Sequence, residues 1–317
     1  MTRRWLAFVI LTRRIGLTRL IGLTGLVGLA AACAGAPMAA SPSNPGHVAH
    51  APLSLAADER MVVIPAGRFV AGSTPEERAT AYDNHVVAAG NDLARTEKWF
   101  DREAERHVVD VGAYRIDLMP VTQSQFAEFV LLERGAAPSI DQAAWPAQGI
   151  ALDVATARAR YAWRDSKPPV GREEHPVVLV TWDDADRYCR WRGTLRGERR
   201  RLPTADEFEK AARGDGGLAY PWGNGFEADK LNSAIGGPGD TTPVGNYATG
   251  ASPYGLLDMA GNVLQWTATP ADGEMVVKGS DWHAFAGLGR GASIDRRPRS
   301  GRFVVVGFRC AADALEP

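Results

Sequence analysis

The sequence predicts one mixed domain of helices and strands with much irregular chain. Short apolar runs near the start are interrupted by Pro65, Gly67 and Gly72, which is typical of strands joined by turns. Thr122 and Thr204 each open a Thr-x-x-Gln/Glu pattern, which is typical of a helix start. The later chain is punctuated by glycine and proline, which predicts little regular structure. After the N-terminal features, about 250 residues remain, a length that one core can organise.

The first elements of the domain follow from hydrophobic patterning. Residues 61–73 predict a strand, a turn and a second strand. Residues 75–104 are rich in charge and predict helix, with Trp99 and Phe100 as apolar anchors. Residues 108–116 alternate between apolar and polar positions, as a strand with one buried face does.

Two helices are expected in the middle of the chain. In the first, the Thr122 side chain caps the helix while Gln125 reaches back to the capping residue. In the second, Asp183 or Asp184 is the expected cap. Their buried faces are expected to carry Phe126, Phe129, Val130, Ala185, Tyr188 and Cys189.

A third helix start lies at Thr204, with Glu207 as its capping partner and Gly214 as its stop. Between the first and second of these helices, residues 135–174 predict a long insertion or loop.

The N-terminus predicts export. Residues 1–33 carry five arginines and no acid, and an uncharged apolar run covers residues 20–32. That run suits a signal peptide better than a membrane span, which needs about 20 residues. It ends in a sequence that resembles a bacterial lipobox, so Cys33 is the expected lipidation site and a membrane anchor. Cleavage by ordinary signal peptidase within 34–40 is the alternative. Either way, the protein is expected in the cell envelope.

Composition limits the partners. Residues 34–57 are uncharged and rich in Ala, Pro and Ser, which predicts a flexible linker before a domain at 58–317. Outside residues 1–33, 31 basic side chains face 37 acidic ones, so nucleic-acid binding is not expected. Exposure on a loop explains the one basic cluster near the C-terminus better than an anion site does. That cluster is Arg296, Arg297, Arg299 and Arg302.

An ordered series of motifs runs through the domain. The motifs are 61–73 (MVVIPAGRFVAGS), 120–126 (PVTQSQF), 175–185 (HPVVLVTWDDA), 201–208 (RLPTADEF), 220–224 (YPWGN), 252–266 (SPYGLLDMAGNVLQW), 278–282 (KGSDW) and 307–311 (GFRCA). In this order they resemble the formylglycine-generating-enzyme (sulfatase-modifying factor) family. The resemblance implies the α+β fold of that family, a C-type-lectin-like variant with much irregular structure. It also implies that Trp182, Trp191, Trp222 and Trp266 are core aromatics.

The resemblance also exposes a departure. Active members of the family use two cysteines, between the motifs matched here at 278–282 and 307–311, to hold copper(I) and oxidise a substrate cysteine to formylglycine. This chain has no cysteine between Trp266 and Cys310. Thiolates are the ligands that select copper(I), so neither copper nor the family's oxidase activity is expected. The family further implies a disulfide between Cys189 and Cys310.

Calcium is the other ligand that the resemblance implies. Asn232 and Asp240 resemble the oxygen donors of one family site. A second family site includes the motif around Asn262, but its Glu is replaced here by Gln265, which weakens the expectation for a hard cation. Asx-turn capping by Asn232 and Asp240 is the alternative interpretation.

Two functions remain open at this point. The first is a non-catalytic binding or accessory lipoprotein of the envelope, with an unknown peptide or small-molecule ligand. The second is a divergent periplasmic oxidoreductase, as the resemblance to cysteine-free relatives in pyoverdine maturation suggests. For the second, the candidate catalytic residues are His283, Asp281 and Arg290, in the segment expected to line the family's cleft.

Overall fold

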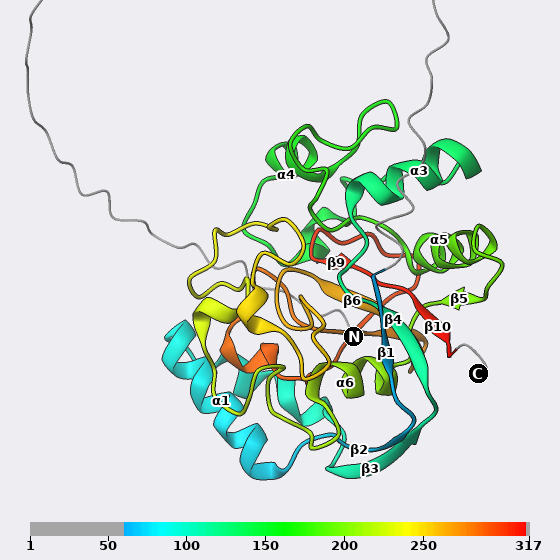
Figure 1. Ribbon diagram of the computed structural model, residues 1–317. Helices are drawn as coiled ribbons and strands as arrows, with labels where there is room; N and C mark the ends of the chain where they lie inside the picture. Colours follow the sequence, from blue (N-terminus) through cyan, green and yellow to red (C-terminus); the bar gives the residue numbers. More distant parts are fainter. Residues whose placement is uncertain (1–59, 315–317) are drawn as a thin grey trace, which may run out of the picture. The chain divides into compact units, whose positions relative to one another are not determined.

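The computed structural model of the protein describes residues 60–314 (Figure 1). The predicted signal peptide, Cys33 and the linker lie outside the described residues. Within residues 60–314, no helix combines the length and the apolar character that a membrane span requires. The domain predicted to begin at residue 58 is therefore described almost throughout.

Three small sheets form the β part of the domain, among the residues that the structure describes. The strands are β1 (Met61–Ile64), β2 (Gly67–Ala71), β3 (His107–Val111), β4 (Tyr114–Asp117), β5 (Arg200–Arg201), β6 (Leu264–Ala271), β7 (Glu274–Lys278), β8 (Asp295–Arg297), β9 (Val306–Gly307) and β10 (Ala311–Asp313). Their orders are β1-β4-β10-β5, β2-β3 and β8-β7-β6-β9. The first sheet joins the two ends of the domain, because β4 pairs antiparallel with both β1 and β10. In the third sheet, β6 and β9 run parallel.

Helices and single turns connect these sheets. The α-helices of the described chain are α1 (Pro75–Ala89), α2 (Leu93–Thr96), α3 (Gln123–Glu133), α4 (Val154–Tyr161), α5 (Trp182–Thr194) and α6 (Ala205–Arg213). The short 3-10 turns are η2 (Trp99–Arg102), η3 (Trp145–Gln148), η4 (Ala228–Lys230), η5 (Ala248–Gly250) and η6 (Ala286–Gly289). The α+β fold with much irregular chain is confirmed.

Two of the predicted helix starts are confirmed and one is wrong. Thr122 begins α3 and Thr204 begins α6, each with a complete capping box. The cap of α5 is Thr181, not Asp183 or Asp184. Asp184 instead occupies the third helical position, where its carboxylate accepts the backbone N–H of Thr181 at 3.1 Å. The aspartate therefore completes the box rather than opening it.

Two other expectations need correction. The helix predicted over 75–104 is interrupted, because Gly90 adopts a left-handed conformation that ends α1. Two short elements, α2 and η2, follow it within the predicted range. The strand predicted over 108–116 is two strands, β3 and β4, which belong to different sheets.

The main core lies between α3, α5 and the strands β6 and β9. Phe126, Phe129, Tyr188 and Phe308 meet there with ring centroids 5.3–6.1 Å apart. Such aromatic packing contributes burial together with specific geometry. The insertion over 135–174 attaches to this core through Trp163, whose indole N–H donates to Gln123 Oε1. Trp182, Trp191 and Trp266 are buried as expected, whereas Trp222 is half-buried.

A smaller apolar cluster holds the segment between β2 and β3, residues 75–103, which we call the helical excursion. Its buried members are Ala81, Tyr82, Ala94 and Phe100. The excursion packs on η6 at Gly287, where a Cβ atom would lie 2.5 Å from the Phe100 ring and 2.8 Å from the carbonyl oxygen of Ala81. Only glycine allows the two segments to approach this closely.

Candidate functional site

The two described cysteines form a disulfide in the main core. Cys189 in α5 and Cys310 before β10 are bonded, with their Cα atoms 5.5 Å apart, and both are buried. The predicted pairing is confirmed. A disulfide offers no thiolate, so this donor set does not fit the family's copper(I) site. The chain between Trp266 and Cys310 contains no other sulfur nucleophile.

A small cavity of about 40 Å³ lies beside the disulfide, between the start of α3 and the end of β4. Its walls include Asp117, Thr122, Tyr188, Arg192 and Cys310. The three candidate catalytic residues are not among its lining residues. The cavity is therefore separate from the segment to which sequence reasoning assigned the chemistry.

Asp281 and His283 lie together in the loop that follows β7. The backbone N–H of His283 donates to Asp281 Oδ1 at 2.7 Å. Burial raises the pKa of the Asp281 carboxyl above its usual value, and the opposing effects of His283 do not cancel this rise. The imidazole of His283 itself is exposed and lies 5.7 Å from the Trp282 ring. These two candidates are brought together, but not in an enclosed pocket.

The strand β8 supplies the nearest other charges. Asp295 and Arg297 both act electrostatically on Asp281, and they form an ion pair with each other at 2.5 Å. Arg102, at the end of η2, reaches Asp295 at 3.5 Å. We call residues 281–297 the candidate segment. It carries a partly exposed cluster in which acids and arginines neutralise one another.

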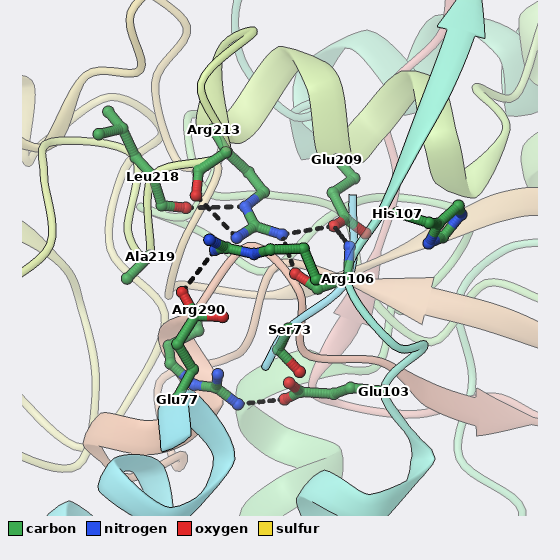
Figure 2. A network of polar contacts seen from close by, with 12 residues as sticks. Ser73, Glu77, Glu103, Arg106, His107, Glu209, Arg213, Leu218, Ala219 and Arg290 are labelled. Atoms are coloured by element: carbon green, nitrogen blue, oxygen red, sulfur yellow. Dashed lines mark hydrogen bonds and ion pairs between the residues drawn. The ribbon is translucent and has the colours of Figure 1, made fainter. Parts of the chain in front are cut away.

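Arg290 belongs to a different environment. Its guanidinium is buried and forms an ion pair with Glu103 (Figure 2). It also donates to the carbonyl oxygen of Gly287. It also lies 5.1 Å from the centre of the Phe100 ring. Among the described residues, its side-chain contacts go to Glu103, Phe100 and Gly287 rather than to Asp281 or His283. The structure therefore places the Arg290 side chain apart from the other two candidates, in an ion pair with Glu103.

Sequence reasoning missed a second buried charge cluster (Figure 2). Glu209 in α6 accepts hydrogen bonds from Arg213 at 2.6 Å, from Lys278 at 2.7 Å and from the backbone N–H of Gly72 at 2.8 Å. Burial raises the pKa of Glu209, but Lys278 and Arg213 outweigh that effect and hold the pKa below its usual value. The spacing of Glu209 and Arg213 by four residues on a helix was the available signal.

Gln265 has a structural task in place of the family's glutamate. Its side-chain oxygen accepts from Arg309 Nε at 2.6 Å, and its amide donates to the backbone oxygen of Asp258 at 2.8 Å. Burial lowers the pKa of Arg309 to about 10, although Asp258 and Asp117 raise it. An uncharged partner therefore holds a deeply buried guanidinium that also donates to four backbone carbonyls.

The predicted calcium donors have other partners. The Asp240 carboxylate accepts from both terminal nitrogens of Arg172, at 2.8 and 3.0 Å, and from the Tyr161 hydroxyl at 2.7 Å. Burial raises the pKa of this carboxyl, but the bonds from Arg172 and Tyr161 hold it below its usual value. Asn232 donates to the backbone oxygen of Asp240, and its own Oδ1 is buried without a described partner. The Asn232 amide oxygen is thus available to a cation, whereas the Asp240 carboxylate is already paired with Arg172.

The C-terminal arginine cluster is neutralised along its length. Its ion pairs join Arg296 to Asp272, Arg297 to Asp295, Arg299 to Asp183 and Arg302 to Asp184. Arg299 also lies 4.2 Å from the centre of the Trp182 ring. With a carboxylate on each guanidinium, this surface does not form a basic anion site.

Comparisons with known proteins agree with the fold. The sequence model of the sulfatase-modifying factor enzyme 1-like domain matches residues 49–314. An inactive C-alpha-formylglycine-generating enzyme 2 of Mus musculus is 33% identical over 309 residues, which covers 84% of this chain and 89% of the relative. A formylglycine-generating enzyme of Mycobacterium tuberculosis is 35% identical over 215 residues, covering 54% of this chain and 69% of that enzyme.

Among solved structures, PvdO from Pseudomonas aeruginosa superimposes with a TM-score of 0.59 at 22% identity, covering 80% of this chain and 94% of PvdO. The fold and the order of the motifs define an α+β domain of the formylglycine-generating-enzyme type. The chain belongs to the sulfatase-modifying factor enzyme family.

Proposed function

We propose that this protein is a family member that does not generate formylglycine and acts as a binding or accessory protein of the cell envelope. The observation that carries the proposal is the state and position of the cysteines. The two described cysteines are joined in the core, and the segment between 278–282 and 307–311 has no thiol. Without thiolates, the chain cannot hold copper(I) in the manner of the family's active members.

The surroundings of the candidate segment support a binding or structural part. His283 is exposed, whereas an acid–base catalyst is more often held in a concave, water-poor site. Phe285 packs on His85 at 5.3 Å, and Leu288 packs against the cluster around Phe100. These side chains fill the space between the segment and the helical excursion. The relative from Mus musculus, which is named inactive, agrees with this proposal.

A peptide assay tests the loss of activity. The purified protein is incubated with a Cys-x-Pro-x-Arg peptide, copper and oxygen, and the peptide mass is measured, with an active family enzyme as the positive control. We expect the peptide to stay unreacted. Conversion of its cysteine to an aldehyde would overturn the proposal.

Attachment to the envelope through Cys33 is tested separately by cell fractionation. The wild-type chain is expected in the membrane fraction, and the Cys33→Ala variant in the soluble periplasmic fraction or uncleaved. Equal distribution of the two forms in the soluble fraction would replace the lipoprotein with a soluble periplasmic protein.

The second candidate function is a divergent oxidoreductase acting on a small molecule or peptide. The observation that favours it is the contact of Asp281 with His283 and the raised pKa of the Asp281 carboxyl, since perturbed acids concentrate at reactive sites. The test is the metal content of the purified protein by mass spectrometry. Retained iron or copper would favour catalysis, and calcium alone would indicate a structural ion.

A further inference from the structure

The loop between η4 and η5 contains an acid that is bound by a cation of the chain itself. The two terminal nitrogens of Arg172 donate to the two oxygens of the Asp240 carboxylate, at 2.8 and 3.0 Å. Such two-pronged pairs are stronger and more directional than single contacts. Tyr161 donates to the same carboxylate at 2.7 Å, and Arg160 lies 3.4 Å away. The negative charge of Asp240 is therefore met without an external ion.

Several contacts besides the ion pair hold the Arg172 side chain in place. Its side chain is only 14% exposed, and its guanidinium lies 5.0 Å from the centre of the Tyr161 ring. It also donates to Thr241 Oγ1 at 2.5 Å, next to the acid that it neutralises. Tyr161 ends α4, so the insertion over 135–174 supplies both the arginine and the tyrosine that hold this loop.

The other predicted calcium donor, Asn232, offers a neutral amide oxygen. Asn232 uses its amide N–H group on the backbone oxygen of Asp240 at 2.8 Å and on Asn262 Oδ1 at 3.3 Å. Its Oδ1 is a buried acceptor that no described residue satisfies. Calcium needs six to eight oxygen ligands, and its affinity rises with the number of charged ones. A lone amide oxygen with backbone carbonyls makes a weak site.

We infer that the Arg172 guanidinium stands where this family's loop would use a divalent cation, so that the loop around Asp240 folds without calcium. A calcium ion on the Asp240 carboxylate would lie within a few ångströms of the guanidinium, and like charges at that distance repel strongly in a partly buried site. Both oxygens of the Asp240 carboxylate are already paired with Arg172. The chain's own cation is tethered and needs no ion from solution.

The test compares the thermal stability of the mature protein in EGTA and in millimolar calcium, together with calcium binding by calorimetry. For the wild type we expect no calorimetric binding and a Tm that differs by less than about 1 °C between the two conditions. One bound calcium per chain, or a clear rise in Tm with calcium, would overturn the inference.

Removal of the guanidinium makes the opposite prediction. In Arg172→Met, the Tm in EGTA is expected to fall by about 5 °C, because the Asp240 carboxylate loses its main partner. Calcium is expected to restore part of that loss, since the freed carboxylate and Asn232 Oδ1 then form a donor set. A variant that loses no stability, or that calcium does not rescue, would contradict the inference.

Two matched variants keep the test decisive. Arg160→Met removes the second, more exposed arginine near Asp240 and is expected to change the Tm little and to remain indifferent to calcium. If Arg172→Met does not fold, the double variant Arg172→Met/Asp240→Asn removes both charges. It is expected to fold and to ignore calcium, whereas calcium-dependent folding of the double variant would overturn the role assigned to Asp240.

Discussion

The α5 side of the domain and the helical excursion are stabilised in different ways. The α5 side has a large apolar core, a cluster of packed aromatic rings and the disulfide between Cys189 and Cys310. The helical excursion has four buried apolar members in its own cluster, and polar and aromatic contacts hold it to η6 and to the flanking residues Phe285 and Arg290. Those contacts include the buried pair of Arg290 and Glu103 and the imidazole of His85.

This difference indicates how each region should fail. A region with much buried apolar surface and a covalent crosslink resists changes in pH and responds to reduction. A region that depends on a buried ion pair and a neutral histidine responds to charge. The candidate segment around Asp281 adjoins the helical excursion. The stability of its surroundings is therefore expected to depend on charge and pH more than the stability of the α5 side does.

The largest effect is expected on the α5 side. Replacing both cysteines, as Cys189→Ser with Cys310→Ser, should lower the free energy of unfolding by roughly 4–5 kcal/mol, because the crosslink closes a long loop in the unfolded chain. The sequence separation of 121 residues is what makes the loop long. Urea unfolding of the variant and of the wild type with and without reductant measures this. Equal stability in all three samples would contradict the crosslink.

The next effect belongs to the helical excursion. Glu103→Gln leaves the Arg290 guanidinium buried without a charge partner, which should cost about 3 kcal/mol. Hydrogen exchange should rise in residues 75–103 more than in α5. Asp272→Asn, which removes the exposed partner of Arg296, is the matched control and should change stability by less than about 0.5 kcal/mol. Uniform loss of protection in both regions would mean that the two are not separable.

A smaller, pH-dependent effect is expected at His85. Its ring packs between Trp99 and Phe285, and burial lowers its pKa, which Asn91 and Asp92 only partly offset. The unfolded chain therefore binds the proton more readily than the folded one. The stabilising effect is complete above about pH 6.5 and is lost as the pH falls below that value.

The measurement for His85 is the free energy of unfolding across that pH range. One proton gives a slope of at most about 1.4 kcal/mol per pH unit. His85→Phe should remove this part of the slope, whereas Asp92→Asn should retain it. A wild-type curve that stays flat between about pH 7.5 and about pH 5.5 would show that His85 does not govern the excursion.

The smallest effect is expected at the candidate residues. Asp281→Asn and His283→Ala should each change the free energy of unfolding by less than about 0.5 kcal/mol. The Asp281 carboxyl already has a raised pKa, so its charge adds little stability, and the His283 side chain is exposed. Urea unfolding checks this. A loss above about 2 kcal/mol in either variant would place that residue in the structural framework and remove it from the list of functional candidates.

Local features were predicted well from the sequence. The capping boxes at Thr122 and Thr204 depend on residues three apart, so no tertiary information is needed to find them. The α5 cap was wrong because the sequence there offers a threonine and two acids in a row, and backbone geometry decides which one caps. The disulfide followed from the family resemblance and not from spacing.

The remaining parts of the site are non-local. Arg290 and Glu103 are 187 positions apart, and Arg172 and Asp240 are 68 apart, so no periodicity connects them. Asp281 and His283 were found because they lie in one short segment, but only the folded chain shows that His283 is exposed.

The sequence by itself determined the family, the order of the elements and the lack of a thiol pair in the segment where active relatives keep one. These are properties of residue identity and local spacing. Tertiary structure alone decided which charges are buried and what neutralises them, because a carboxylate's partner depends on segments that meet only in the folded chain. For that reason Arg290 pairs with Glu103 rather than with Asp281 or His283, and Asp240 is bound by Arg172.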